Sequence, residues 1–263
     1  MTIFRESLFF RSFLASLLVS SGAVATEPDD FDWRGLAVHA SPIPNLENGS
    51  RLVFIGDSIT DMKWGRNESD RNHYLGHSFV FLLAARLGVE MPDAKLQFFN
   101  RGNSGNKVSD LSLRWQRDVI DLKPDVLTIL IGANDVGIGF RHPQKKVTPD
   151  SFQNEYHKLL EACMKATPQL KLVLMDPFVL PAKRLGDNTA WRSEMDCLRN
   201  CVKQLAEEFG AVHVRLQDVF DAAAAASSAE QWIWDGIHPL PPGHELIARH
   251  WLLEVCRRWP VED

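Results

Sequence analysis

The feature that most constrains the fold of this chain is a regular alternation of short apolar runs with longer amphipathic stretches. The five apolar runs cover residues 52–55, 96–99, 126–131, 170–175 and 212–214. They are built mainly from Val, Ile, Leu and Phe, which is typical of strands that are buried on both faces. The runs therefore predict a parallel sheet of about five strands.

The amphipathic stretches between these runs predict helices. They cover residues 78–87, 108–122, 152–163, 189–209 and 244–258. The third stretch follows Thr148-Pro149, in which Thr can cap a helix and Pro suits its first turn. Strands that alternate with helices predict right-handed crossovers and a three-layer α/β/α sandwich. Ligands of such sheets bind beyond the carboxyl ends of the strands.

The first 25 residues have the pattern of an export signal. Arg5 and Arg11 outweigh Glu6 by one positive charge, residues 12–24 are almost wholly apolar or small, and Ala25 ends a small-x-small cleavage pattern. The apolar run is shorter than the roughly 20 residues that span a bilayer. An uncleaved anchor or a buried N-terminal helix is the alternative. We expect cleavage near Ala25 and a secreted or periplasmic protein without a stable membrane anchor.

Residues 26–50 are rich in Pro, Asp, Asn and Ser and show no clear period. We expect this leader segment to lie over the domain surface or to stay mobile. Residues 51–263 then form one folded domain.

The composition argues against several classes of partner and cofactor. A net charge of −5 does not suggest nucleic acid or an anionic membrane. The four cysteines, at positions 163, 197, 201 and 256, can pair in three ways, and their disulfide status stays open. They lack the paired spacing of a zinc site, and His73 and His77 have no matching carboxylate ligands nearby. We expect no metal and no cofactor.

Residues that can carry out chemistry follow four of the predicted strands. The motifs are GDSIT at 56–60, NRGNSG at 100–105, GAND at 132–135 and WDGIHP at 234–239. Because the carboxyl ends of parallel strands share one edge of the sheet, we expect these motifs to lie close together.

The motifs contain every group that ester hydrolysis requires. Ser58 can act as the nucleophile, His238 as the base and Asp235 as the group that orients the base. The N–H groups of Ser58 and Gly105 and the amide of Asn134 can stabilise the oxyanion. Asp135 is expected to brace its loop.

This set of motifs resembles the SGNH hydrolases, also called GDSL-type esterases. The match covers about residues 50–257, with GDSIT, NRGNSG, GAND and DGIHP as the four blocks. The resemblance implies a flavodoxin-like sandwich and a Ser58–His238–Asp235 triad. It also implies an oxyanion hole formed by Ser58, Gly105 and Asn134. The chain lacks the G-x-S-x-G motif of α/β-hydrolases.

The long polar loop at residues 61–74 is a candidate for the substrate mouth, and a solvated surface loop is the alternative. Trp64, Arg66 and Arg71 are its candidate substrate contacts, and residues 178–188 form a second candidate loop.

The predicted function is a secreted serine esterase that removes short acyl groups, such as acetyl, from carbohydrate through an acyl-enzyme. Its substrate would be a small-molecule or polysaccharide ester. The alternatives are a lysophospholipase or thioesterase of the same fold and a non-catalytic carbohydrate-binding homologue.

Overall fold

The computed structural model describes residues 32–35, 43, 46–186 and 188–259. Within them, five parallel strands form one sheet in the order β2-β1-β3-β4-β5. The strands are β1 (Arg51–Gly56), β2 (Gln97–Gly102), β3 (Val126–Leu130), β4 (Lys171–Met175) and β5 (Val212–Val214). The predicted parallel sheet is confirmed, and its strand order is the flavodoxin-like one.

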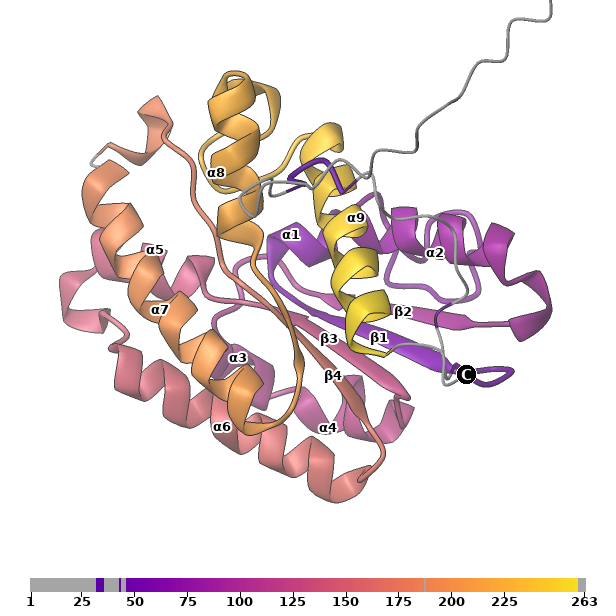
Figure 1. The fold of residues 1–263 in the computed structure, drawn as a ribbon. Coiled ribbons are helices and arrows are strands. Elements are labelled where there is room, and N and C mark those ends of the chain that lie inside the picture. Colours follow the sequence, from indigo (N-terminus) through magenta and orange to yellow (C-terminus); the bar gives the residue numbers. More distant parts are fainter. Residues whose placement is uncertain (1–31, 36–42, 44–45, 187, 260–263) are drawn as a thin grey trace, which may run out of the picture. The chain divides into compact units, whose positions relative to one another are not determined.

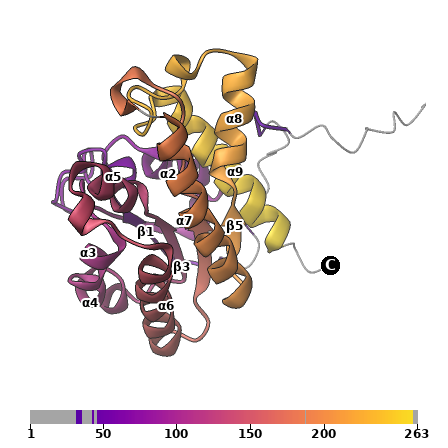
Figure 2. The same cartoon turned by 90° about the vertical axis from the view of Figure 1, so that its left-hand side faces the viewer.

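Helices cover both faces of the sheet (Figures 1 and 2). One face carries α1 (Ser58–Asp61), α2 (Phe79–Glu90), α8 (Leu216–Ala226) and α9 (Pro241–Arg258). The opposite face carries α3 (Val108–Ser112), α4 (Trp115–Asp118), α5 (Ala133–Arg141), α6 (Pro149–Ala166) and α7 (Asn188–Glu208). The three-layer α/β/α sandwich is therefore confirmed.

Strand β1 shows why both faces need a cover. Successive side chains of a strand point to opposite faces. Accordingly, Leu52 and Phe54 pack with the first layer, whereas Val53 and Ile55 pack with the second. All four side chains are fully buried. This double burial fixes the sheet as the rigid platform that carries the loops at its carboxyl edge.

One predicted helix differs from the structure. The stretch 108–122 is divided into α3, α4 and a 3₁₀ turn at Ile120–Leu122. The break falls at Arg114, whose backbone (φ −129°, ψ 5°) leaves the helical region. Its guanidinium hydrogen-bonds to the backbone of β1 and β2, so the tertiary contacts of Arg114 outweigh the local helical pattern.

The predicted export signal and its cleavage site lie outside the described residues. Of the leader, Trp33 packs edge to face on Trp232 at 5.7 Å between ring centres, and its carbonyl accepts a hydrogen bond from His250 Nε2 at 2.8 Å. No helix among the described residues has both the length and the apolar character needed to cross a bilayer.

Candidate active site

Ser58, His238 and Asp235 form a continuous chain of hydrogen bonds at the carboxyl edge of the sheet. The Ser58 Oγ lies 2.8 Å from His238 Nε2, and His238 Nδ1 lies 2.8 Å from Asp235 Oδ2. Ser58 and His238 are 180 residues apart in the sequence, so only the fold brings them together. In this arrangement the imidazole can take a proton from the hydroxyl while the carboxylate stabilises the resulting positive charge.

The position of Ser58 depends on the two residues before it. A Cβ at Gly56 would lie 2.2 Å from the carbonyl oxygen of Leu130 on β3, so this position admits only glycine. Asp57 caps α1 by accepting a hydrogen bond from the Ile59 N–H at 3.0 Å. Ser58 therefore begins the helix, and its own N–H has no acceptor within it.

The electrostatics of His238 and Asp235 suit a base and its orienting carboxylate. Burial raises the pKa of Asp235, but hydrogen bonds from the His238 ring and from the N–H groups of His238 and Ile237 outweigh it and lower the pKa to about 2. The hydrogen bond that His238 donates to Asp235 raises the pKa of His238, and burial opposes this increase. The carboxylate is thus held ionised beside the imidazole.

Gly105 and Asn134 are the two other predicted oxyanion donors, and Asn134 lines the same cavity as Ser58. Gly105 has φ +85°, and a Cβ there would meet nothing within 4 Å. Its N–H has no acceptor among the described residues. Asn134 lies in the first turn of α5, and its Nδ2 donates to the Asn106 carbonyl at 3.2 Å. Nδ2 also donates to Asp57 Oδ2 at 3.5 Å, so both N–H bonds of the amide have an acceptor, and the contact with Asp57 is the longer of the two.

Asp135 braces the loop, as expected. Its carboxylate is buried and accepts from the Val108 N–H, with Oδ1 and Oδ2 at 3.1 and 3.3 Å. Burial raises the pKa of Asp135 to about 7. This residue therefore ties the start of α5 to the start of α3.

The cavity at Ser58 has a volume of about 390 Å³. Besides the triad and Asn134, its lining includes five large side chains that the motifs did not reveal: Phe140, Arg141, Arg184, Leu185 and Trp191. Among them, Arg184 and Leu185 lie in the loop at 178–188 that was a candidate substrate contact. Phe140, Arg141 and Trp191 lie in helices, where the sequence offered only a helical pattern.

The structure does not bring Trp64, Arg66 and Arg71 to this cavity. Trp64 and Arg66 line a neighbouring cavity of about 460 Å³, and Arg71 lies along a third, with its guanidinium carbon 5.8 Å from the centre of the Tyr74 ring. The neighbouring cavity is larger, but the reactive groups converge at Ser58, and chemistry rather than size identifies the site.

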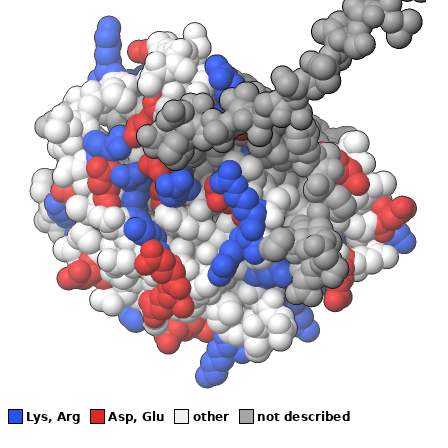
Figure 3. All heavy atoms as spheres, in the orientation of Figure 1, with Lys and Arg blue, Asp and Glu red and all other residues white. Residues whose placement is uncertain are grey.

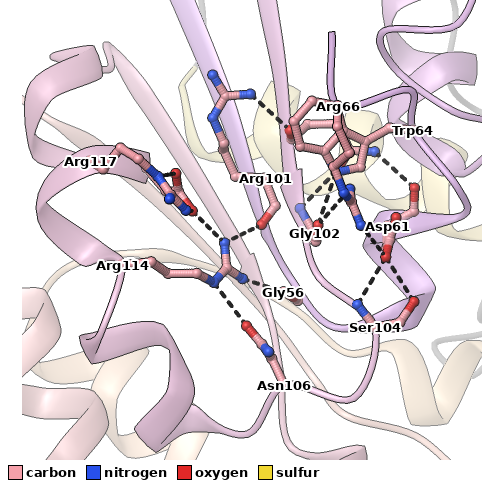
Figure 4. Close-up of polar contacts among 12 residues, drawn as sticks. Gly56, Asp61, Trp64, Arg66, Arg101, Gly102, Ser104, Asn106, Arg114 and Arg117 are labelled. Carbon is pink, nitrogen blue, oxygen red and sulfur yellow. Dashed lines mark hydrogen bonds and ion pairs between the residues drawn. The ribbon is translucent and has the colours of Figure 1, made fainter.

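Arg66 and Trp64 instead belong to a hydrogen-bonded cluster with Asp61 and Gly102 (Figure 4). Arg66 pairs with Asp61 at 2.7 Å, and both Arg66 and Trp64 donate to the Gly102 carbonyl. The Asp61 carboxylate in turn accepts from the N–H and the hydroxyl of Ser104, at 2.9 and 2.7 Å. The cluster thus fixes the loop that carries Gly105.

Arg114 holds the same loop from the other side (Figure 4). It donates to the side chain of Asn106 at 2.8 Å and to the carbonyls of Arg101 and Gly56 at 2.7 and 3.2 Å. Asp118 balances its charge at 2.8 Å. One guanidinium therefore ties the ends of β1 and β2 to the loop beside Gly105.

Metal ligands and disulfides do not gather in the described part of the chain. Its His, Cys, Asp and Glu residues form no group of three that could hold a metal ion. His73 is engaged with Asp70 at 2.9 Å. The four cysteines are free thiols, and burial raises the pKa of Cys163 to about 12.

Comparisons with known proteins identify relatives over most of the chain. Residues 54–246 match the model of the GDSL-like Lipase/Acylhydrolase family. An acetylxylan esterase from Geobacillus stearothermophilus is 34% identical over 217 residues, which cover 81% of this chain and 97% of the relative.

Solved structures agree with this result. A crystal structure of an acetylxylan esterase from the same organism superposes with a TM-score of 0.73 at 33% identity, covering 83% of this chain and 99% of that one. An alpha/beta hydrolase enzyme from the metagenome of Lake Arreo, Spain, gives a TM-score of 0.71 at 34% identity, with coverage of 80% and 96%.

Proposed function

We propose, because the chain belongs to the GDSL-like lipase/acylhydrolase family of carboxylic-ester hydrolases, that it removes O-acetyl groups from carbohydrate with Ser58 as its nucleophile. The observation that carries the proposal is the hydrogen-bonded chain from Ser58 through His238 to Asp235, with two contacts of 2.8 Å.

The first step of the proposed reaction forms an acyl-enzyme. His238 Nε2 takes the proton of Ser58 as Oγ attacks the ester carbonyl carbon, and the electron pair of the carbonyl moves onto its oxygen. The imidazolium then gives the proton to the sugar oxygen as the bond between that oxygen and the acyl carbon breaks. Asp235 keeps Nε2 directed at Ser58 and stabilises the imidazolium.

Three donors would stabilise the oxyanion that forms in each step. They are the N–H groups of Ser58 and Gly105 and the Asn134 amide, which would exchange its 3.5 Å contact with Asp57 for one with the oxyanion. Such donors act strongly because they are fixed before the charge develops. The positive φ of Gly105 and the open space beside its Cα let a substrate oxygen approach that N–H closely.

The second step releases the acyl group. A water molecule attacks the acyl carbon while His238 accepts its proton, and the same proton then returns to Ser58 as the acid leaves. The products are acetic acid and a free sugar hydroxyl.

The carbohydrate substrate is supported by two observations. The 34% identical relative is an acetylxylan esterase. The cavity at Ser58 is also lined by aromatic rings and by two arginines, which suits a polar ring more than a long acyl chain. Secretion is supported by the signal pattern of residues 1–25, and N-terminal sequencing of the exported protein tests cleavage after Ala25.

The proposal is tested by hydrolysis of acetylated xylo-oligosaccharides, with release of acetate as the readout. We expect Ser58→Ala to lower kcat by several orders of magnitude. Ser112→Ala is the matched control, because Ser112 is exposed on α3 and bonds only within its own helix. Undiminished acetate release by Ser58→Ala would show that Ser58 is not the nucleophile. If the wild-type protein hydrolysed a lysophospholipid or a thioester but no acetylated sugar, the proposed carbohydrate substrate would be wrong.

A further inference from the structure

We propose that Arg141 and Arg184 form a binding site for a carboxylate at the cavity of Ser58, so that the preferred substrate is an acetylated carbohydrate that carries uronic acid groups. The inference rests on the proposed function, since it specifies the alcohol part of the ester that Ser58 attacks. Both arginines line the same cavity of about 390 Å³ as Ser58 and His238.

Arg141 reaches the cavity from the side of Asn134. It is the last residue of α5, and its guanidinium lies over Gly137, one turn beyond Asn134. A Cβ at Gly137 would lie 3.4 and 3.6 Å from the two terminal nitrogens of Arg141 and 3.1 Å from the Trp191 ring. Glycine at this position leaves room for Arg141 and Trp191 to lie together above α5.

Arg184 reaches the cavity from the side of the triad loop. Its guanidinium carbon lies 4.3 Å from the centre of the Trp234 ring, and Trp234 immediately precedes Asp235. The neighbouring Leu185 fills the space beside Gly236, where a Cβ would lie 2.3 Å from its side chain. This contact holds the turn at Lys183–Leu185 against the loop that carries His238.

The charge of these two arginines is not neutralised within the described part of the chain. Neither side chain has an ion pair or a side-chain hydrogen bond there, and the one acidic residue among the described lining of the cavity, Asp235, is engaged by His238. By contrast, Arg66, Arg101 and Arg114 of the neighbouring cavity are each paired with a carboxylate.

The rest of the molecule gives this local excess its significance. The whole chain has a net charge of −5, and positive and negative side chains are intermingled over the face drawn in Figure 3. Two cations without counter-charges at the mouth of one cavity therefore create a local positive potential. Arginine is the residue best suited to a carboxylate, because its planar fork of N–H groups matches the two carboxylate oxygens.

Aromatic rings in the same place favour a sugar as the carrier of that carboxylate. Phe140 and Trp191 stack with ring centres 4.9 Å apart, and Phe140 is 41% exposed. Trp234, beneath Arg184, is 58% exposed. Exposed rings of this kind offer flat apolar faces to the C–H groups of a sugar ring, while the arginines bind its polar substituent.

The test compares two forms of one substrate. Acetylated xylo-oligosaccharides that carry glucuronic acid are offered with the carboxyl group free and with it methyl-esterified, and kcat/KM is measured for each. We expect the wild-type protein to prefer the free acid by about tenfold, mainly through KM, since hydrogen bonds between charged groups are the strong ones. This preference should shrink at high salt.

Variants then assign the preference to its residues. Arg141→Gln and Arg184→Gln should each reduce the ratio of the two kcat/KM values, and the double variant should bring it close to one. Because both side chains are exposed and each ratio is taken within one protein, a change in folded fraction cancels. Arg258→Gln is the matched control: it removes one positive charge from the far end of α9, about 25 Å along the helix from its start beside His238.

The outcomes separate this inference from the proposed function. A wild-type ratio near one, with acetate release that depends on Ser58, overturns the carboxylate site alone. A preference that survives in the double variant, or that Arg258→Gln abolishes equally, also overturns it. Acetate release that persists in Ser58→Ala, or no release from either substrate by the wild type, overturns the proposed function itself.

Discussion

Asp61 accepts two hydrogen bonds from Ser104, one from its backbone N–H at 2.9 Å and one from its hydroxyl at 2.7 Å. Asp61 ends the helix that Ser58 begins, and Ser104 precedes Gly105. The pair therefore sets the spacing between the proposed nucleophile and one proposed oxyanion donor. Burial raises the pKa of Asp61, but hydrogen bonds from Arg66 and Ser104 outweigh it and lower the pKa, so the carboxylate stays ionised.

Asp61→Asn should lower kcat by about tenfold to a hundredfold, because a shift of about 1 Å in a positioned group can cost that much. KM for an acetyl ester should change much less, since Asp61 does not line the cavity at Ser58. Ser104→Ala should have the same sign and a smaller size. Asp70→Asn, which alters an exposed carboxylate of the same loop, is the control. Equal kcat values in Asp61→Asn and the wild type would contradict a positioning role.

Asn134→Ala should lower kcat by about a hundredfold to a thousandfold, which is the usual effect of removing one oxyanion donor. The acid limb of the pH profile should stay in place, because the hydrogen bonds of His238 to Ser58 and Asp235 do not involve Asn134. Steady-state kinetics across pH measure both quantities. A loss confined to KM would assign Asn134 to substrate binding instead.

The hydrogen bond that His238 donates to Asp235 raises the pKa of His238 above its ordinary value of 6.5. Only the neutral imidazole can take the proton of Ser58, so kcat/KM should rise with pH and reach half its maximum above pH 6.5. Asp235→Asn removes the cause of the shift and should move this limb to lower pH while reducing the maximum. A limb that stays in place in Asp235→Asn would show that another group controls it.

His244 should make the folded protein sensitive to acid. It is buried, its Nδ1 accepts from the Phe79 N–H at 3.3 Å, and burial lowers its pKa from 6.5 to about 3. A depressed folded-state pKa gives stability that is present above pH 6.5 and is lost as the pH falls toward 3. This residue alone should lower the free energy of unfolding by about 2 kcal/mol between pH 7 and pH 5.

Urea unfolding at the two pH values measures this loss in the wild type and in His244→Asn. Asparagine can retain an acceptor for the Phe79 N–H but does not titrate. We expect the difference between the two pH values to shrink by about 2 kcal/mol in the variant. An unchanged difference would show that His244 titrates normally in the folded state.

The sequence predicted the fold and the placement of the reactive groups because both depend on regular patterns. Buried parallel strands produce apolar runs, and the chain must emerge at the carboxyl edge immediately after each run. Ser58 and Asn134 lie within a few residues of such an exit, so their proximity followed from the topology. His238 instead lies beyond α8, in the loop before α9, and its place beside Ser58 was predicted from its motif.

The positions of side chains that reach the site through tertiary packing could not be predicted from these sequence patterns. Arg141 and Trp191 come from two helices, and the absence of a side chain at Gly137 lets them meet. Arg66 lies in the predicted loop, but its guanidinium is bound by Asp61 and by the Gly102 carbonyl and does not line the Ser58 cavity. The break at Arg114 has the same origin, because its partners lie on two strands.

Covalent labelling by a sulfonyl fluoride tests the central claim most directly, because it reports which serine is activated. After treatment with phenylmethylsulfonyl fluoride, peptide mass spectrometry should find one adduct, on Ser58, with loss of esterase activity in proportion to labelling. His238→Ala should label far more slowly at the same pH. An adduct on another serine, or full activity in protein labelled at Ser58, would contradict Ser58 as the nucleophile.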